Sequence, residues 1–138
     1  MIVACGSNDV ARWGGRESPP SLSLAFRMET WSKLIEEAKR IFDLIYVCQV
    51  LPVDESKVPA RKNEQGLDQF YRNDAINEYN SALKNLCSDH ACRFVDFTAM
   101  LEANDWKACL FDDVHPNAEG HELISRRMFK ELEAALLS

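Results

Sequence analysis

The hydrophobic residues of this chain alternate between short continuous runs and longer stretches with helical spacing. The short runs predict strands at 2–5, 44–51 and 93–97. The second run is β-branched and almost wholly apolar, which is typical of a strand buried on both faces. The longer stretches predict helices that start near residues 28, 71 and 118. A strand followed by a helix, repeated in this way, predicts an α/β fold with a parallel sheet of three strands.

Apolar stripes define the buried face of the first two predicted helices. In the first helix the stripe comprises Met28, Trp31, Leu34, Ile35, Ala38, Ile41 and Phe42. In the second it comprises Tyr71, Ala75, Ile76, Tyr79, Leu83 and Leu86. Turn-forming residues between 6 and 27 and polar residues between 54 and 66 predict loops. Without internal repeats or a linker, we expect one domain over residues 1–138.

The balance of charge argues against two classes of partner. The formal net charge is −6, and basic and acidic residues are intermixed without a basic stripe. Nucleic acid and anionic membrane surfaces both select for clustered positive charge, so neither is expected as a partner. No apolar run reaches the roughly 18–20 residues of a membrane-spanning helix. The first residues also do not resemble a signal peptide.

The five cysteines are odd in number and lie mostly among apolar neighbours. This pattern favours reduced thiols and a cytoplasmic protein over a disulfide framework. Cys87, His90 and Cys92 form a compact group, but a fourth ligand at zinc-site spacing is missing. We therefore expect a role in packing or in a turn for this group, and no metal.

His115 is the strongest candidate for acid–base chemistry, because imidazole titrates near neutral pH. Asp112 precedes it by three residues, a spacing at which a tight turn can bring the carboxylate against one ring nitrogen. The carboxylate would fix the tautomer and leave the other nitrogen as a base. Pro116 favours extended backbone at His115. On these residues alone, a solvated turn that caps the following helix is an equally good interpretation.

The segment after the first predicted strand reads Gly-Ser-Asn-Asp. The amide of Asn8 could donate a hydrogen bond to an oxyanion, and Gly6 would let the backbone approach a substrate closely. Taken alone, an ordinary turn stabilised by the Asn8 side chain is the better interpretation of this segment.

Together, the two segments resemble conserved blocks of the SGNH hydrolases, also called GDSL-type lipases and esterases. Gly6-x-Asn8-Asp9 is similar to the third block of that family, and Asp112-x-x-His115-Pro116 to the fifth. The resemblance covers the whole chain and implies a flavodoxin-like fold of three layers, α/β/α. It also implies hydrolysis of small acyl esters without a cofactor, with His115 as general base and then acid, Asp112 as its partner, Asn8 as oxyanion donor and Gly6 as the turn residue.

The chain departs from the family pattern because the Gly-Asp-Ser block with the serine nucleophile and the second-block glycine are both missing. The chain thus resembles the C-terminal two-thirds of the family. We expect an N-terminally truncated domain, as a shortened gene, a natural fragment or a chain completed by another. Loss of the first strand would expose a sheet edge, which favours a homo-oligomer or a complementing chain at that edge.

Three resident side chains are candidates to replace the missing serine. Ser7 is expected to alternate away from Asn8, and Cys5 to point into the core. Cys109 lies near the Asp112–His115 pair in sequence, but its apolar neighbours favour packing. None is preferred as a nucleophile. The leading hypothesis is an ester hydrolase seen without its nucleophile segment. The alternative is a catalytically silent domain that binds or assembles. A nucleotide-binding module lacks the glycine-rich phosphate loop.

Overall fold

A computed structural model describes residues 1–57 and 62–137 of the chain. Its central sheet has three parallel strands in the order β1 (Ile2–Val3), β3 (Tyr46–Cys48) and β5 (Arg93–Val95). The α/β class and the three-stranded parallel sheet are therefore confirmed. The strands are shorter than their apolar runs. Beyond β3, Val50 bonds to the Asn80 side chain, and beyond β5, Phe97 N donates to the Gln49 side chain.

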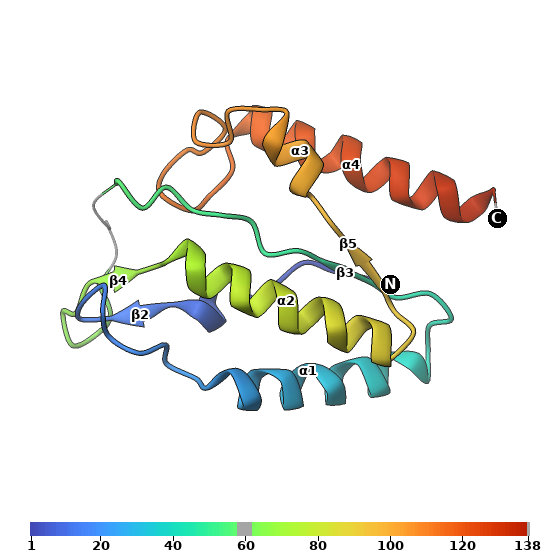
Figure 1. The fold of residues 1–138 in the computed structure, drawn as a ribbon, viewed down its shortest axis with the longest axis horizontal. Coiled ribbons are helices and arrows are strands. Elements are labelled where there is room, and N and C mark those ends of the chain that lie inside the picture. The colour runs from blue at the N-terminus through green and yellow to red at the C-terminus, as the bar shows by residue number, and fades with distance from the viewer. Residues whose placement is uncertain (58–61, 138) are drawn as a thin grey trace.

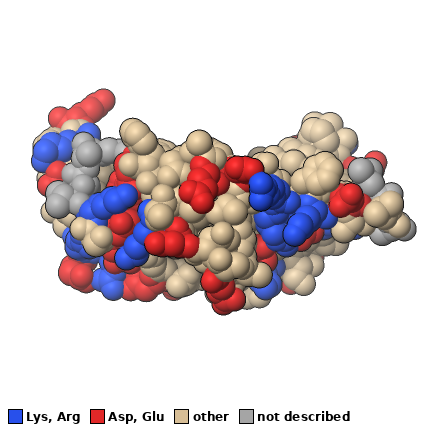
Figure 2. Space-filling view, turned by 90° about the horizontal axis from the view of Figure 1, so that it is seen from above, with Lys and Arg blue, Asp and Glu red and all other residues tan. Residues whose placement is uncertain are grey.

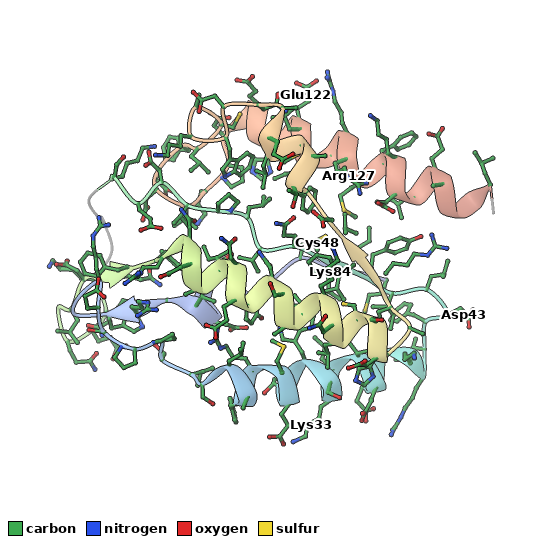
Figure 3. All side chains as sticks on the ribbon, in the orientation of Figure 1. Lys33, Asp43, Cys48, Lys84, Glu122 and Arg127 are labelled. Carbon is green, nitrogen blue, oxygen red and sulfur yellow. The ribbon has the colours of Figure 1, made fainter. Side chains whose placement is uncertain are left out.

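Helices cover both faces of this sheet (Figure 1). On one face lie α1 (Leu24–Lys39) and α2 (Asn73–Asp89), whose apolar side chains pack with Ile45 and Val47. On the other lie α3 (Thr98–Glu102) and α4 (Ala118–Leu136), which pack against Tyr46, Cys48 and Val95. The strand β3 is buried throughout, and Cys48 lies between the two helical layers (Figure 3). The fold therefore has the predicted three layers.

The ends of the helices follow from local side-chain bonds. Ser23 caps α1 by accepting a hydrogen bond from Phe26 N, so the helix starts four residues before the predicted Met28. Asn117 caps α4 in the same way, by accepting from Gly120 N at 3.0 Å. The start of the last helix is therefore confirmed.

The predicted stripe of α1 is partly wrong. Trp31, Ile35 and Ala38 are buried, but Leu34 is 44% exposed and Ile41 is 77% exposed. Ile41 lies beyond the last residue of α1, where the helical spacing no longer places it on the buried face. The stripe of α2 is buried from Ala75 to Leu83, whereas Tyr71 precedes that helix.

A second, two-stranded sheet was not predicted. It pairs β2 (Arg12–Trp13) with β4 (Gln69–Phe70) in antiparallel register, Arg12 opposite Phe70. Both strands lie in segments with the composition of loops, and two residues are too few to show alternation. Residues 58–61 of the predicted loop 54–66 lie outside the described residues.

The described surface mixes both signs of charge. Figure 2 views the molecule from above the orientation of Figure 1, and on this face lysines and arginines lie among aspartates and glutamates. Within the described residues, none of the helices is long and apolar enough to cross a membrane.

The carboxyl end of β3 is completed by a side chain of α2. Asn80 is buried, accepts a hydrogen bond from Val50 N at 2.9 Å and donates one to Val50 O at 2.8 Å. Both backbone groups are thereby satisfied without a neighbouring strand. Asn80 thus fixes the position at which the chain turns away from the sheet after β3.

Replacing this side chain tests that assignment. Asn80→Ala removes both bonds and leaves two buried backbone groups unpaired, so the free energy of unfolding should fall by about 2–4 kcal/mol in urea titrations. Asn77→Ala, on the exposed side of the same helix, should change it by less than about 1 kcal/mol. Equal losses in the two variants would contradict a specific role for Asn80.

Candidate active site

The carboxyl ends of β1, β3 and β5 open into a cleft of about 810 Å³. Asn8 lies in its wall after β1, and His115 lies in its wall after the segment that follows β5. Apolar side chains complete the lining, among them Leu51, Phe97 and Ile124. The two segments singled out in the sequence are therefore brought to the same cleft.

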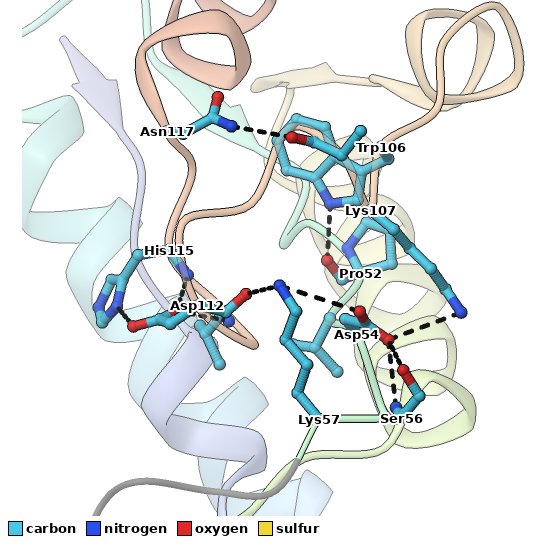
Figure 4. A network of polar contacts seen from close by, with 12 residues as sticks. Pro52, Asp54, Ser56, Lys57, Trp106, Lys107, Asp112, His115 and Asn117 are labelled. Carbon is cyan, nitrogen blue, oxygen red and sulfur yellow. Dashed lines mark hydrogen bonds and ion pairs between the residues drawn. The ribbon is translucent and has the colours of Figure 1, made fainter.

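The predicted Asp112–His115 pair is formed. His115 Nδ1 lies 2.7 Å from Asp112 Oδ2 (Figure 4). The other carboxylate oxygen accepts hydrogen bonds from Val114 N at 2.8 Å and His115 N at 2.6 Å. An ionised carboxylate only accepts, so Nδ1 carries the proton and Nε2 is the basic nitrogen of the ring.

The electrostatics of Asp112 favour its charged form. Partial burial raises the pKa of its carboxyl, but the hydrogen bonds from the His115 ring and two backbone amides outweigh this effect. The net result is a pKa well below the usual range for aspartate. Near neutral pH the Asp112 carboxylate is therefore negatively charged beside Nδ1, which would stabilise an imidazolium.

A polar network holds the Asp112 loop in place, and the sequence did not reveal it (Figure 4). Lys57 Nζ donates to the backbone oxygen of Asp112 at 2.8 Å, and Asp54 N donates to Asp113 O at 2.8 Å. The Asp54 carboxylate is buried and accepts from the hydroxyl of Ser56 at 2.6 Å, which lowers its pKa. The loop after β3 thus anchors the loop with the acid–base pair, through residues far apart in sequence.

The turn with Asn8 is a short 3-10 helix, η1 (Ser7–Val10), separated from β1 by three residues. Gly6 precedes it with φ of 118°, a left-handed conformation that favours glycine. A Cβ at Gly6 would lie 2.8 Å from the hydroxyl oxygen of Tyr79, so the backbone packs directly on that ring. The prediction of a turn at Gly6 is thus explained by both backbone conformation and space.

Two tyrosines bond to η1. The hydroxyl of Tyr79 donates to Asp9 Oδ2 at 2.9 Å, and itself accepts from the indole nitrogen of Trp31. The hydroxyl of Tyr71 donates to Asn8 Oδ1 at 3.1 Å. The hydrophobic pattern places both tyrosines in an apolar stripe, because it does not reveal where a hydroxyl lies.

The three candidate nucleophiles have different environments. Cys5 does not point into the core as predicted; it is exposed and lines the cleft, because β1 is an edge strand among the described residues. Ser7 lines the same cleft, whereas Cys109 is buried with Trp106 and Leu110 as expected. Of these three side chains, Cys5 and Ser7 therefore line the cleft that also contains His115.

Trp13 and Trp106 differ in whether they reach the cleft. Trp13 lies in the wall of the cleft, carried there by β2. Trp106 is buried and donates its indole N–H to Pro52 O at 2.8 Å (Figure 4). Only Trp13 is therefore placed to contact a molecule in the cleft.

Acid titration of stability tests the charge state of Asp112. Asp112→Asn should lower the free energy of unfolding by about 1 kcal/mol near neutral pH. The loss is small because the Asp112 carboxylate is partly exposed and solvent screens its interactions. The folded-state pKa is lowered, so this contribution is present above the unfolded value of about 4 and is lost as the pH falls further toward the folded-state pKa.

The measurement is urea unfolding of both proteins between about pH 3 and pH 7, and the difference between them should shrink toward the acid end. Asp43→Asn is a matched control, because Asp43 lies exposed at the far side of the molecule (Figure 3). A difference that stays constant with pH would contradict the lowered pKa.

Substitution of Gly6 tests the contact with Tyr79. Gly6→Ala should cost about 2–4 kcal/mol of unfolding free energy, because left-handed strain and overlap with the ring add. Gly14 also has a positive φ, of 89°, but a Cβ there would meet nothing closer than 3.8 Å. Gly14→Ala should therefore lower the free energy of unfolding by only about 1 kcal/mol. Equal costs in thermal or urea unfolding would exclude the contact as the cause.

The GDSL-like lipase/acylhydrolase family model matches residues 1–123. No curated protein sequence matches the chain significantly. Among solved structures, a GDSL-like lipase from Bacteroides thetaiotaomicron superposes with a TM-score of 0.66 at 19% identity, over 97% of this chain and 62% of that one. A member of the lipolytic G-D-S-L family from Veillonella parvula gives a TM-score of 0.59 at 20% identity, over 80% and 54%.

An acetylxylan esterase from Geobacillus stearothermophilus gives a TM-score of 0.55 at 20% identity, over 79% of this chain and 47% of that one. At these identities the structural similarity shows the shared fold. The chain spans less than two thirds of each of these neighbours. The family match itself covers most of the chain. The chain therefore belongs to the GDSL-like lipase/acylhydrolase family.

Proposed function

We propose that this chain carries the acid–base half and one oxyanion donor of a serine-type site that hydrolyses small acyl esters. The observation that carries the proposal is the meeting of the Asp112–His115 pair and Asn8 in one cleft. These groups supply two functions that acyl transfer needs, a positioned base and a donor for the developing charge. The family membership supports the same chemistry.

The reaction follows from the geometry of the pair. His115 Nε2 takes the proton of an attacking hydroxyl, whose oxygen bonds to the ester carbonyl carbon. The carbonyl oxygen becomes an oxyanion and accepts a hydrogen bond from Asn8 Nδ2. His115 then gives its proton to the leaving alkoxide, which leaves the acyl group on the nucleophile. A water molecule, deprotonated by the same nitrogen, releases the acid and returns the nucleophile to its hydroxyl form.

In this proposal the nucleophile arrives on a polypeptide segment that pairs along β1. Within the part of the chain that the structure describes, β1 pairs with β3 on one side only. Ile2 is 49% exposed, and Ala4 and Cys5 are exposed although they continue an apolar run. An exposed strand edge of this kind is a template for a further strand. The segment belongs to another part of a longer protein, to a second copy or to another chain.

The underside of α4 supports the same proposal. Its apolar residues Ile124, Met128 and Leu132 pack toward the sheet but are only half-buried. A strand along β1 with a helix beside α4 would cover both surfaces and remove apolar area from water.

A catalytically silent binding or assembly domain is the second candidate. It is favoured by one observation: the Cys109 thiol, which lies near the pair in sequence, is buried with Trp106 and Leu110. In that case the open β1 edge is the functional surface, and the Asp112–His115 pair serves only to shape the loop.

Hydrolysis of p-nitrophenyl acetate separates the two candidates. A general base with an oxyanion donor still activates water, so we expect slow turnover by this chain, about 10²–10⁴-fold above the buffer rate. His115→Ala should abolish it, and Asn8→Ala should reduce it by up to about 10²-fold. Turnover in the His115→Ala variant equal to that of the unmodified chain would support the silent domain.

Treatment with a serine-reactive fluorophosphonate, followed by intact-mass analysis, locates the nucleophile. The chain alone should remain without an adduct, because the proposed serine is not among its residues. A single adduct that depends on His115 would instead show that a resident side chain is the nucleophile, and peptide mapping would identify it.

A further inference from the structure

Asn8, the oxyanion donor of the proposed site, has a side-chain amide that rotates easily about its terminal torsion. A contact with another residue is needed to hold the amide in one orientation. An asparagine side chain can turn its amide by 180° at little cost, because the terminal torsion is broad and roughly two-fold. In one orientation Asn8 presents Nδ2, a donor, to the cleft, and in the other it presents Oδ1, an acceptor. Only the first orientation stabilises an oxyanion, so the order of this amide decides whether the donor works.

The structure assigns that ordering role to Tyr71: we propose that Tyr71 is a positioning residue that holds the Asn8 amide with its donor nitrogen available to the cleft. This inference rests on the proposed ester hydrolysis and adds a residue to it. The Tyr71 hydroxyl donates to Asn8 Oδ1 at 3.1 Å, which occupies the acceptor end of the amide. Among the residues that the structure describes, none accepts a hydrogen bond from Asn8 Nδ2.

The backbone beneath Asn8 is held separately. Gly6 packs on the Tyr79 ring, and the Asp9 carboxylate accepts from the Tyr79 hydroxyl at 2.9 Å. Tyr79 is fully buried and accepts a hydrogen bond from Trp31. These contacts fix η1 on either side of Asn8 but do not touch its amide. The orientation of that amide therefore depends on Tyr71.

The second sheet explains how Tyr71 reaches this position. Tyr71 directly follows β4, whose Phe70 pairs with Arg12 of β2, the strand that follows η1 by one residue. The pairing ties the chain before Tyr71 to the chain after Asn8. Arg72 adds ion pairs to Glu17 at 2.8 Å and to Asp74, which hold the same segment. Tyr71 is itself 5% exposed, so its ring has little freedom to move.

The dynamics of the Asn8 side chain test the inference without any need for activity. In ¹⁵N-labelled protein, Tyr71→Phe keeps the ring and removes only the hydroxyl, so the order parameter of the Asn8 Nδ2 group should fall below about 0.6. The backbone amide of Asn8 should keep its value near 0.85, because Tyr79 still holds η1. Tyr46→Phe, which removes another buried tyrosine hydroxyl, should change neither value. An Asn8 side chain as ordered in Tyr71→Phe as in the unmodified chain would overturn the inference.

A double-mutant cycle on p-nitrophenyl acetate hydrolysis gives the functional readout. Tyr71→Phe should lower kcat roughly tenfold with KM little changed, which is less than complete loss of an oxyanion donor costs. In an Asn8→Ala background the same substitution should have no further effect. An undiminished effect in that background would overturn the role assigned to Tyr71. Absence of His115-dependent hydrolysis in every variant would count against the proposed function, while the order parameters still decide the role of Tyr71.

Discussion

The parallel pairing of β1, β3 and β5 is the constraint on which the site depends. Tyr46 is the partner of both Ile2 and Arg93, so the three strands run in step and end at the same edge. Side chains finish that edge: Asn80 completes the backbone at Val50, and Gln49 Oε1 accepts from Phe97 N at 2.6 Å. Because the three strands end at the same edge of the sheet, the turns that follow them meet at one cleft.

Two different kinds of interaction then build the two halves of the site. The acid–base half is assembled within four residues, since one carboxylate of Asp112 bonds to the ring and the backbone of His115. The oxyanion half is assembled from distant segments, because Asn8 and its neighbours are held by two tyrosines that lie before and within α2. The buried Asp54 and the Lys57 amine play a supporting part by tying the His115 loop to the end of β3.

This division explains what could be predicted from the sequence. The buried strand at Tyr46–Cys48 and the Asp112–His115 pair were predictable because both follow from local pattern. The contact of Tyr71 with Asn8 was not, since the two residues are 63 positions apart and hydrophobic spacing says nothing of a hydroxyl. Cys5 was misplaced because alternation along a strand predicts burial only where the neighbouring surface is covered.

The same division sets the order in which the site would fail on heating. The Asp112–His115 contact closes a loop of three residues, whereas Asn8–Tyr71 and Asp9–Tyr79 close loops of 63 and 70. Contacts between distant segments are lost when one helix detaches, while contacts within a turn survive as long as the turn does. Loosening of α2 would therefore release the Asn8 amide while leaving the imidazole and its carboxylate in place. Such a partly opened molecule could still transfer protons after it had stopped stabilising the charge that the transfer creates.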